Sequence, residues 1–317
     1  MDFEIMLCIT VPVFNHEKYV IKALDSIKMQ KTKYSFEVLI GEDCSTDHTR
    51  SILKEYQKSC PDNFIFLYRE KNMHGSKINN GIDLKLRSKG KYTITLEGDD
   101  YWLDSNKIER QISFLENNPQ YIACAHNCVV VDEESVENGE AYPECKDREY
   151  GFDHYLFGIL PGQTATVMMR NIYNKAVDVD QSILQKGLVP GDRVMYFVLM
   201  CYGRIYCYQE VMSAYRHVIK SGSSFSATTT FDAKRELEWH NEILQYAKKI
   251  KHNKGIVYSS CRLFFCIRHC ALHGLISSTT FFSYTRKIMF SPNFIKLVLK
   301  HEFARIKERL LQKIYAK

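Results

Sequence analysis

The residues with the clearest chemical meaning lie in KYTITLEGDDYW, residues 91–102. The alternating apolar residues from 92 to 96 predict a buried strand. Directly after it come three carboxylates around one glycine, namely Glu97, Gly98, Asp99 and Asp100. Carboxylates this close repel one another and lose hydration when buried, unless a hard cation lies among them. A solvated acidic turn would explain two adjacent aspartates alone. The preceding strand and the motifs upstream favour a metal ion that holds a phosphate-bearing ligand.

Two earlier strand ends carry residues suited to the same ligand. The first predicted strand ends near Pro12, with Phe14 and Glu17 just beyond, and the second ends near Asp43. Gly75, in the loop before the third helix, would permit close approach of a sugar or phosphate. In an open α/β sheet the carboxyl ends of the strands lie on one edge, where ligands bind. Alone, each feature is equally well a strand exit, a capped helix or a turn, so the predicted nucleotide site depends on their order.

The elements that must position these residues alternate along the first 132 residues. This alternation predicts an α/β fold with a mainly parallel sheet. The expected strands are residues 5–13, 36–42, 64–69, 92–97 and 121–132. The expected helices are residues 18–30, 47–58, 77–89 and 106–117. Residues 133–150 are acidic and contain glycine and proline, which predicts a surface excursion.

Composition narrows the class of protein. No apolar run approaches the roughly 20 residues that span a bilayer, and the acidic residues at positions 2 and 4 argue against a secretory signal. The eleven cysteines are scattered and odd in number, which is typical of buried thiols in a reducing compartment. We therefore expect a cytoplasmic protein. The net charge of +6 is concentrated in residues 284–317 rather than on the α/β region, so no nucleic-acid partner is expected.

The C-terminal third, residues 231–317, predicts helices. Its last helix carries one apolar stripe at three- and four-residue steps, formed by Ile295, Leu299, Phe303, Ile306, Leu310 and Ile314. The intervening residues are mostly Lys and Arg. Two interpretations stay open: the helix packs on its own domain, or it docks on an anionic membrane surface. The small polar residues 221–230 predict a mobile loop.

Taken in order, the motifs resemble the GT-A glycosyltransferases of family 2, bacterial polysaccharide-biosynthesis members in particular. The matching segments are ITVPVFNHEKYV, VLIGEDCSTDHT, KGKYTITLEGDDYW with DSNKIERQ, and VPGDRVMYFVLMCYGRIYCYQEVMSAYR. The resemblance implies a GT-A, Rossmann-like fold with a helical C-terminal extension. It implies a catalytic domain over 1–217, an active-site loop over 218–230 and a helical region over 231–317.

The same resemblance implies roles for particular residues. Pro12, Phe14, Glu17 and Asp43 would contact the nucleotide, and Gly75 would approach the sugar or phosphate. Asp100 would bind Mn²⁺ or Mg²⁺, and Asp99 would face the ribose or a water on the metal. Arg216 would neutralise the diphosphate, and His217 would be a further metal ligand or a phosphate contact. Glu97 stands where aspartate is commoner, so it is assigned no direct metal bond.

Asp192 would be the catalytic base. From the residues alone it is equally a helix cap, because Pro-Gly-Asp before an apolar run is a good helix start. Gln163 and Thr164 would line the acceptor side, and the 221–230 loop would close over the donor.

The implied activity is inverting, metal-dependent transfer of a sugar from a nucleotide-diphospho-sugar, expected to be UDP-linked. The acceptor would be a hydroxyl of a glycan or lipid-linked oligosaccharide in cell-surface polysaccharide biosynthesis, at or near the cytoplasmic face of the membrane. One alternative is a nucleotidyltransferase, but the first loop lacks the Gly/Arg/Lys-rich sequence that would hold a triphosphate. A second alternative is a catalytically silent sugar-nucleotide-binding scaffold.

Overall fold

The computed structural model describes residues 4–174, 177–218 and 231–315. The chain forms two compact units. The first unit is Met1–Gly151 with Ile159–Thr229, and the second is Phe152–Gly158 with Thr230–Lys317. This division differs from the predicted boundaries in the segment 152–158, which the sequence placed in the catalytic domain. The predicted loop, 221–230, lies outside the described residues.

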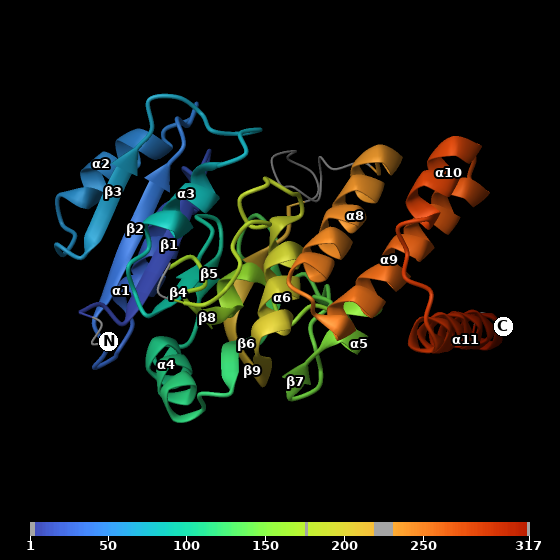
Figure 1. Ribbon diagram of the computed structural model, residues 1–317. Helices are drawn as coiled ribbons and strands as arrows, with labels where there is room; N and C mark the ends of the chain where they lie inside the picture. The colour runs from blue at the N-terminus through green and yellow to red at the C-terminus, as the bar shows by residue number, and fades with distance from the viewer. Residues whose placement is uncertain (1–3, 175–176, 219–230, 316–317) are drawn as a thin grey trace. The chain divides into compact units, whose positions relative to one another are not determined.

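A nine-stranded sheet forms the centre of the first unit (Figure 1), with strand order β3-β2-β1-β4-β8-β6-β9-β5 and β7 paired to β9. The strands are β1 (Leu7–Val13), β2 (Phe36–Glu42), β3 (Phe64–Tyr68), β4 (Tyr92–Thr95), β5 (Tyr101–Trp102), β6 (Tyr121–Val131), β7 (Glu149–Tyr150), β8 (Met168–Arg170) and β9 (Arg204–Arg216). The pairs β1–β2, β1–β4 and β2–β3 are parallel, as predicted. Antiparallel pairing begins at β8, which lies between β4 and β6, so the whole sheet is mixed.

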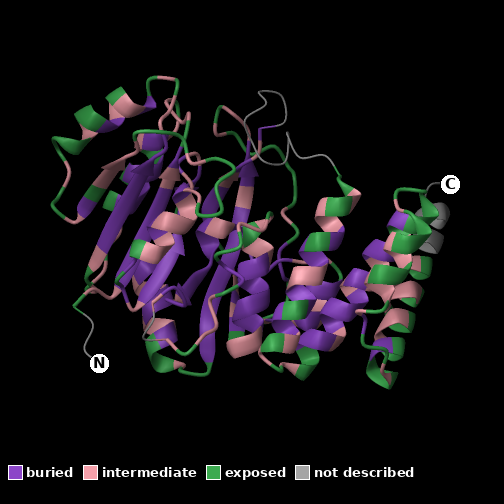
Figure 2. Ribbon diagram, turned by 45° about the horizontal axis from the view of Figure 1, so that its top comes forward, coloured by how far each residue is buried: buried purple, intermediate pink, exposed green. Residues whose placement is uncertain are grey.

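The four helices predicted for the α/β region are confirmed within a few residues at each end. The helices of the first unit are α1 (Val20–Lys28), α2 (Thr49–Gln57), α3 (Asn80–Arg87), α4 (Lys107–Asn117) and α6 (Gly191–Tyr202), with a short 3-10 turn at Thr164–Thr166. Strand residues alternate between two packed faces. Val38 and Ile40 belong to the main core with residues of α1, α2 and α4, whereas Leu39 packs with Leu84 of α3. The central strands are therefore buried on both sides, as Figure 2 shows in purple.

Parallel pairing brings three strand ends to one edge of the sheet. Val13 lies opposite Glu42, and Thr10 lies opposite Thr95. The acidic segment then passes close to the exit of β1, since a Cβ on Gly98 would lie 2.6 Å from His16 Nδ1 and 3.1 Å from Val13 Cγ2. Glycine at 98 therefore lets the acidic segment approach β1.

The second unit consists of α5 (Phe152–Leu156), α8 (Ala233–Lys249), α9 (Asn253–Leu272), α10 (Ser278–Thr285) and α11 (Pro292–Tyr315). Asp153 joins three of these helices, because its Oδ1 accepts from Tyr258 Oη at 3.0 Å and from Lys300 Nζ at 3.1 Å. On α11, Phe294 is buried. Four residues of the predicted stripe are instead 53–70% exposed, namely Ile295, Leu299, Phe303 and Ile306. In the part of the chain that the structure describes, no helix meets the length and apolarity needed to cross a bilayer.

Candidate active site

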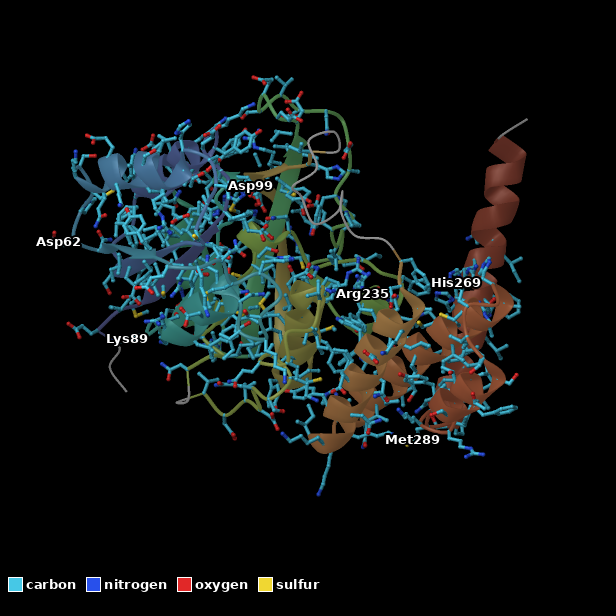
Figure 3. The ribbon with its side chains drawn as sticks, turned by 90° about the horizontal axis from the view of Figure 1, so that it is seen from above. Asp62, Lys89, Asp99, Arg235, His269 and Met289 are labelled. Atoms are coloured by element: carbon cyan, nitrogen blue, oxygen red, sulfur yellow. The ribbon has the colours of Figure 1, made fainter. Side chains whose placement is uncertain are left out.

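The acidic cluster lies just beyond the end of β4. One carboxylate oxygen from each of Glu97, Asp99 and Asp100 lies within 4.8 Å of the others. Figure 3 labels Asp99, which lies among the inner side chains of the first unit, whereas Asp62 and Lys89 lie at its periphery. The side chain of Asp99 is 30% exposed, but Asp100 is only 1% exposed. Within the cluster, the Asp99 carboxylate is therefore accessible to solvent, whereas the Asp100 carboxylate is buried.

Asp100 is held on both oxygens. Its Oδ1 accepts from the backbone N–H of Arg216 at 2.8 Å, and its Oδ2 accepts from Gln163 Nε2 at 2.7 Å. Burial, with repulsion from Asp99 and Glu97, raises the pKa of Asp100 well above its usual value. The sequence assigned the metal to Asp100 first. The geometry favours Asp99 for that contact, because Asp99 has the more accessible carboxylate.

Glu97 connects the cluster to the predicted base. Burial raises the pKa of Glu97 to about 7, and repulsion from Asp99 and Asp192 adds to the shift, whereas Lys85 opposes it. Asp192 therefore lies within electrostatic range of the acidic cluster. Because a divalent cation relieves repulsion among carboxylates, these all-oxygen side chains fit Mg²⁺ or Mn²⁺. The sequence assigned no direct metal bond to Glu97, but one of its oxygens lies within 4.8 Å of an oxygen of Asp99. Asp99 and Glu97 would therefore hold such an ion, with Asp100 behind them.

Asp192 lies in the first turn of α6, after Pro190. Its Oδ1 accepts from the backbone N–H of Arg193 at 2.8 Å, and the side chain is half-buried. A carboxylate within electrostatic range of the acidic cluster is the kind of group that serves as a general base.

The residues predicted to bind the nucleotide surround the ends of β1 and β2. Pro12 lies in β1 opposite Gly41, and Phe14 is 40% exposed beyond it. Asp43 Oδ1 accepts from the backbone N–H of Met73 at 2.9 Å. Burial raises the pKa of Asp43. Gly75 has a φ of +74° with open space around it; this left-handed conformation favours glycine.

Glu17 has a structural partner that the sequence did not suggest. Its Oε2 accepts from the backbone N–H of His48 at 2.8 Å, and its own N–H donates to Asp47 Oδ2 at 3.2 Å. Glu17 thereby joins the loop after β1 to the start of α2. Its predicted contact with the nucleotide stays a prediction.

Arg216 and His217 both contact other protein groups in the structure, and their predicted roles toward the diphosphate and the metal stay predictions. The Arg216 guanidinium is buried and donates to protein oxygens, namely those of Asp99 O, Asp132 O, Glu133 O and Ser135 Oγ. It also lies 4.1 Å from the centre of the Tyr19 ring. It therefore anchors the chain around the acidic cluster. His217 Nδ1 pairs with Glu140 Oε2 at 2.5 Å, and His217 is not among the described side chains that could share one ion with the cluster.

Sequence reasoning missed two residues near the site. Lys85 of α3 interacts electrostatically with Glu97 and Asp192. Tyr142, in the segment predicted to be a surface excursion, interacts with the same two carboxylates. No sequence motif marks either residue, because Lys85 sits in an ordinary amphipathic helix and Tyr142 sits in an irregular segment. Gln163, which the sequence placed on the acceptor side, fixes Asp100.

The chain is similar in sequence to several bacterial proteins. It is 30% identical over 203 residues to an uncharacterized protein of Mycobacterium bovis, covering 64% of this chain and 56% of the relative. The chain thus spans about half the length of that relative. It is 26% identical over 247 residues to the putative teichuronic acid biosynthesis glycosyltransferase TuaG of Bacillus subtilis, covering 75% of this chain and 90% of TuaG.

Solved structures confirm the fold. The crystal structure of Staphylococcus aureus TarS 1-349 in complex with UDP superposes with a TM-score of 0.60 at 18% identity, covering 88% of this chain and 75% of that one. The complex of the same protein with UDP-GlcNAc gives a TM-score of 0.59 at 16% identity, covering 84% and 73%. Residues 8–174 match the family model described as Glycosyl transferase family 2. This match covers more than half of the chain, which therefore belongs to glycosyl transferase family 2 and has the GT-A fold predicted from its motifs.

Proposed function

We propose that this protein is an inverting, metal-dependent glycosyltransferase. It transfers one sugar from a nucleotide-diphospho-sugar, with UDP as the nucleotide, to a hydroxyl of a glycan or lipid-linked acceptor. The observation that carries the proposal is the acidic cluster at the end of β4 with Asp192 beside it. The names of TuaG and TarS, the latter a poly(ribitol-phosphate) beta-N-acetylglucosaminyltransferase, support a place in cell-surface polysaccharide synthesis.

Each residue of the site has a separate role in the proposed reaction. Asp192 accepts the proton of the acceptor hydroxyl as its oxygen attacks the anomeric carbon, and the bond from that carbon to the diphosphate breaks on the opposite side. A divalent cation held by Asp99 and Glu97 would neutralise the departing diphosphate. Gln163 and the Arg216 backbone keep Asp100, and with it the neighbouring Asp99, in place.

We propose UDP as the nucleotide because of the residues just beyond β1 and β2. The free lone pairs of Asp43 could accept the imide N–H of uracil, and Phe14 offers an exposed ring nearby. The TarS complexes with UDP and UDP-GlcNAc lend support through their shared fold. A nucleotidyltransferase would bind a nucleoside triphosphate in preference to UDP, and a silent scaffold would bind UDP without turnover.

Replacement of Asp192 tests the proposal. We expect Asp192→Asn to lower sugar transfer from a UDP-sugar by roughly 10²–10⁴-fold, the usual contribution of a general base. UDP affinity, measured by calorimetry with Mn²⁺, should stay within about twofold because Asp192 acts on the acceptor side. Asp62→Asn, at an exposed position far from the site, is the matched control. Unchanged transfer by Asp192→Asn would remove the assignment of the base, and no UDP binding by the wild type would remove the donor.

The exposed stripe of α11 supports docking on an anionic membrane. Ile295, Leu299, Phe303 and Ile306 present apolar side chains to solvent, and Lys296, Lys300, Arg305 and Lys307 lie between them in sequence. Each basic residue near an anionic lipid surface adds about 1 kcal/mol to binding. We expect cosedimentation with phosphatidylserine-containing vesicles and much less with pure phosphatidylcholine. The double variant Leu299→Ser, Phe303→Ser should stay in solution, whereas Leu272→Ser, at a 77% exposed residue of α9, should not differ from wild type. Equal sedimentation of all three proteins would refute this docking.

A further inference from the structure

Two hydrogen-bond donors near the active site have no partner among the residues that the structure describes. The first is the ammonium of Lys85, a half-buried residue of α3, whose Nζ lies 5.9 Å from the centre of the Tyr173 ring. The second is the hydroxyl of Tyr142, whose ring packs edge-on against Tyr215 at 5.4 Å. Both residues are half-buried, and neither donor atom is among the fully buried side-chain atoms without a partner in the described chain, so both donors are open to solvent or to a ligand.

Lys85 and Tyr142 come from distant parts of the chain and lie within electrostatic range of the same two carboxylates. Glu97 and Asp192 are the two carboxylates that act on Lys85, and both also act on Tyr142. The backbone supports this convergence. A Cβ on Gly187 would lie 3.0 Å from Lys77 Cα, so the segment before Asp192 crosses the chain that leads into α3.

If the proposed function holds, the space between Glu97 and Asp192 is where the transferred sugar binds. Glu97 belongs to the cluster that would hold the metal and diphosphate, and Asp192 would face the acceptor hydroxyl. The sugar to be transferred must lie between those two groups, because its anomeric carbon is bonded to the diphosphate and attacked by the acceptor. Lys85 and Tyr142 therefore border the space of that sugar.

We propose that Lys85 and Tyr142 bind the transferred sugar through its hydrogen-bond-accepting oxygens and so determine which sugar is used. This inference rests on the proposed function and deepens it. An ammonium only donates hydrogen bonds, and a phenol donates one and accepts others. Their common ligand is an oxygen that accepts, either a ring hydroxyl or the carboxylate of a uronic acid. A site built to hydrogen-bond one substrate group rejects analogues that lack it by large factors.

A purely structural role for Lys85 gives a different expectation. If its ammonium only offsets the negative charge of Glu97 and Asp192, loss of that charge would disturb metal and UDP binding for every donor equally. If Lys85 contacts the sugar, its loss would spare UDP and would weaken only donors that carry the recognised oxygen.

The test compares Lys85→Met and Tyr142→Phe with two controls. Lys89→Met removes an exposed ammonium from the chain just after α3, and Tyr34→Phe removes a hydroxyl that pairs with Ser113 Oγ of α4. All proteins are first checked for an unchanged thermal unfolding midpoint. Calorimetry with Mn²⁺ then gives affinities for UDP, UDP-glucose, UDP-N-acetylglucosamine and UDP-glucuronic acid, and turnover assays give KM and kcat for whichever donor the wild type uses.

We expect UDP affinity within about twofold of wild type in all four variants. The KM for the accepted donor should rise about tenfold or more in Lys85→Met and Tyr142→Phe, in line with the loss of a charged or neutral hydrogen bond, and Lys85→Arg should recover part of it. A loss confined to UDP-glucuronic acid identifies a carboxylate, and a loss for the neutral donors identifies a hydroxyl.

Two results would overturn the inference. One is an equal loss of affinity for UDP and for every UDP-sugar, which is the signature of a structural counter-ion. The other is an unchanged KM in both variants. Failure of the proposed function is distinct from either, because the wild type itself would then bind no UDP.

Discussion

Replacing Glu97 with glutamine should make the metal-free protein more stable at alkaline pH. Burial, with repulsion from Asp99 and Asp192, raises the pKa of Glu97 from 4.5 to about 7 in the folded protein. A raised carboxyl pKa gives stability that is fully present below the unfolded pKa and is lost as pH rises through the folded pKa. The wild type should therefore lose stability as pH rises from about 4.5 to 7, whereas the amide of the Glu97→Gln variant has no proton to lose.

The size of the effect follows from the shift. Each pKa unit corresponds to about 1.4 kcal/mol, so the advantage of Glu97→Gln should grow by roughly 2–3 kcal/mol between pH 5 and pH 8. Urea unfolding in the presence of EDTA measures it at both pH values. Mn²⁺ at 100 times its Kd should remove most of this difference, because it stabilises the folded wild type by about 2.7 kcal/mol and the variant lacks one ligand.

Glu116→Gln is the matched control, with the opposite sign. Burial acts to raise the pKa of Glu116, but hydrogen bonds from Lys91 and Tyr92 outweigh it and lower that pKa. Glu116→Gln should therefore be destabilising at pH 8 and less so at low pH. The reasoning fails if Glu97→Gln is no more stable than wild type at pH 8 in EDTA, or if its advantage is the same at pH 5.

Three further substitutions test the supports of the site. Gly98→Ala would place a Cβ 2.6 Å from His16 Nδ1; the ring can shift, so Mn²⁺ affinity measured by calorimetry should fall several-fold while the unfolding midpoint changes little. Trp102→Phe removes the Nε1–H that donates to Ala165 O at 3.0 Å and should cost about 1–3 kcal/mol in urea unfolding. Burial lowers the pKa of Lys107 to about 7, so wild-type stability should rise as pH increases above 7. Lys107→Met should lose roughly 2 kcal/mol of that rise between pH 6 and 9.

Much of the first unit could be predicted because its signals are local. The run 36–42 is mostly apolar and is followed by Asp43, and the observed strand has the predicted bounds. The parallel order of β1, β2 and β4 also follows from alternating strands and helices. The position of β8 does not, because its three residues lie between β4 and β6 only through pairings with distant strands.

The site was predicted in part for the same reason. Asp99, Asp100 and Asp192 follow recognisable strand and helix signals, and the structure places them near one another. Arg216 is the last residue of β9 and His217 follows it, but their side chains pair with groups in residues 132–140. The sequence of that irregular segment has no periodic pattern from which its course could be predicted. Lys85 and Tyr142 were missed because only the tertiary structure brings them near Glu97 and Asp192.

The two adjacent aspartates differ in the roles that we assign to them. Asp99 is available to bind a metal ion, whereas Asp100 is buried and holds the segment in place. Asp100 and Trp102 are two positions apart, and each is only 1% exposed. Gln163 donates to Asp100, and Trp102 donates to Ala165, so one short segment, 163–165, fixes both buried side chains. Asp99, the residue before Asp100, lies in a turn, where its side chain is 30% exposed and its Oδ2 lies 3.9 Å from His16 Nε2. The buried aspartate thus sets the position of the exposed one, and loss of Gln163 should loosen Asp99 without touching it.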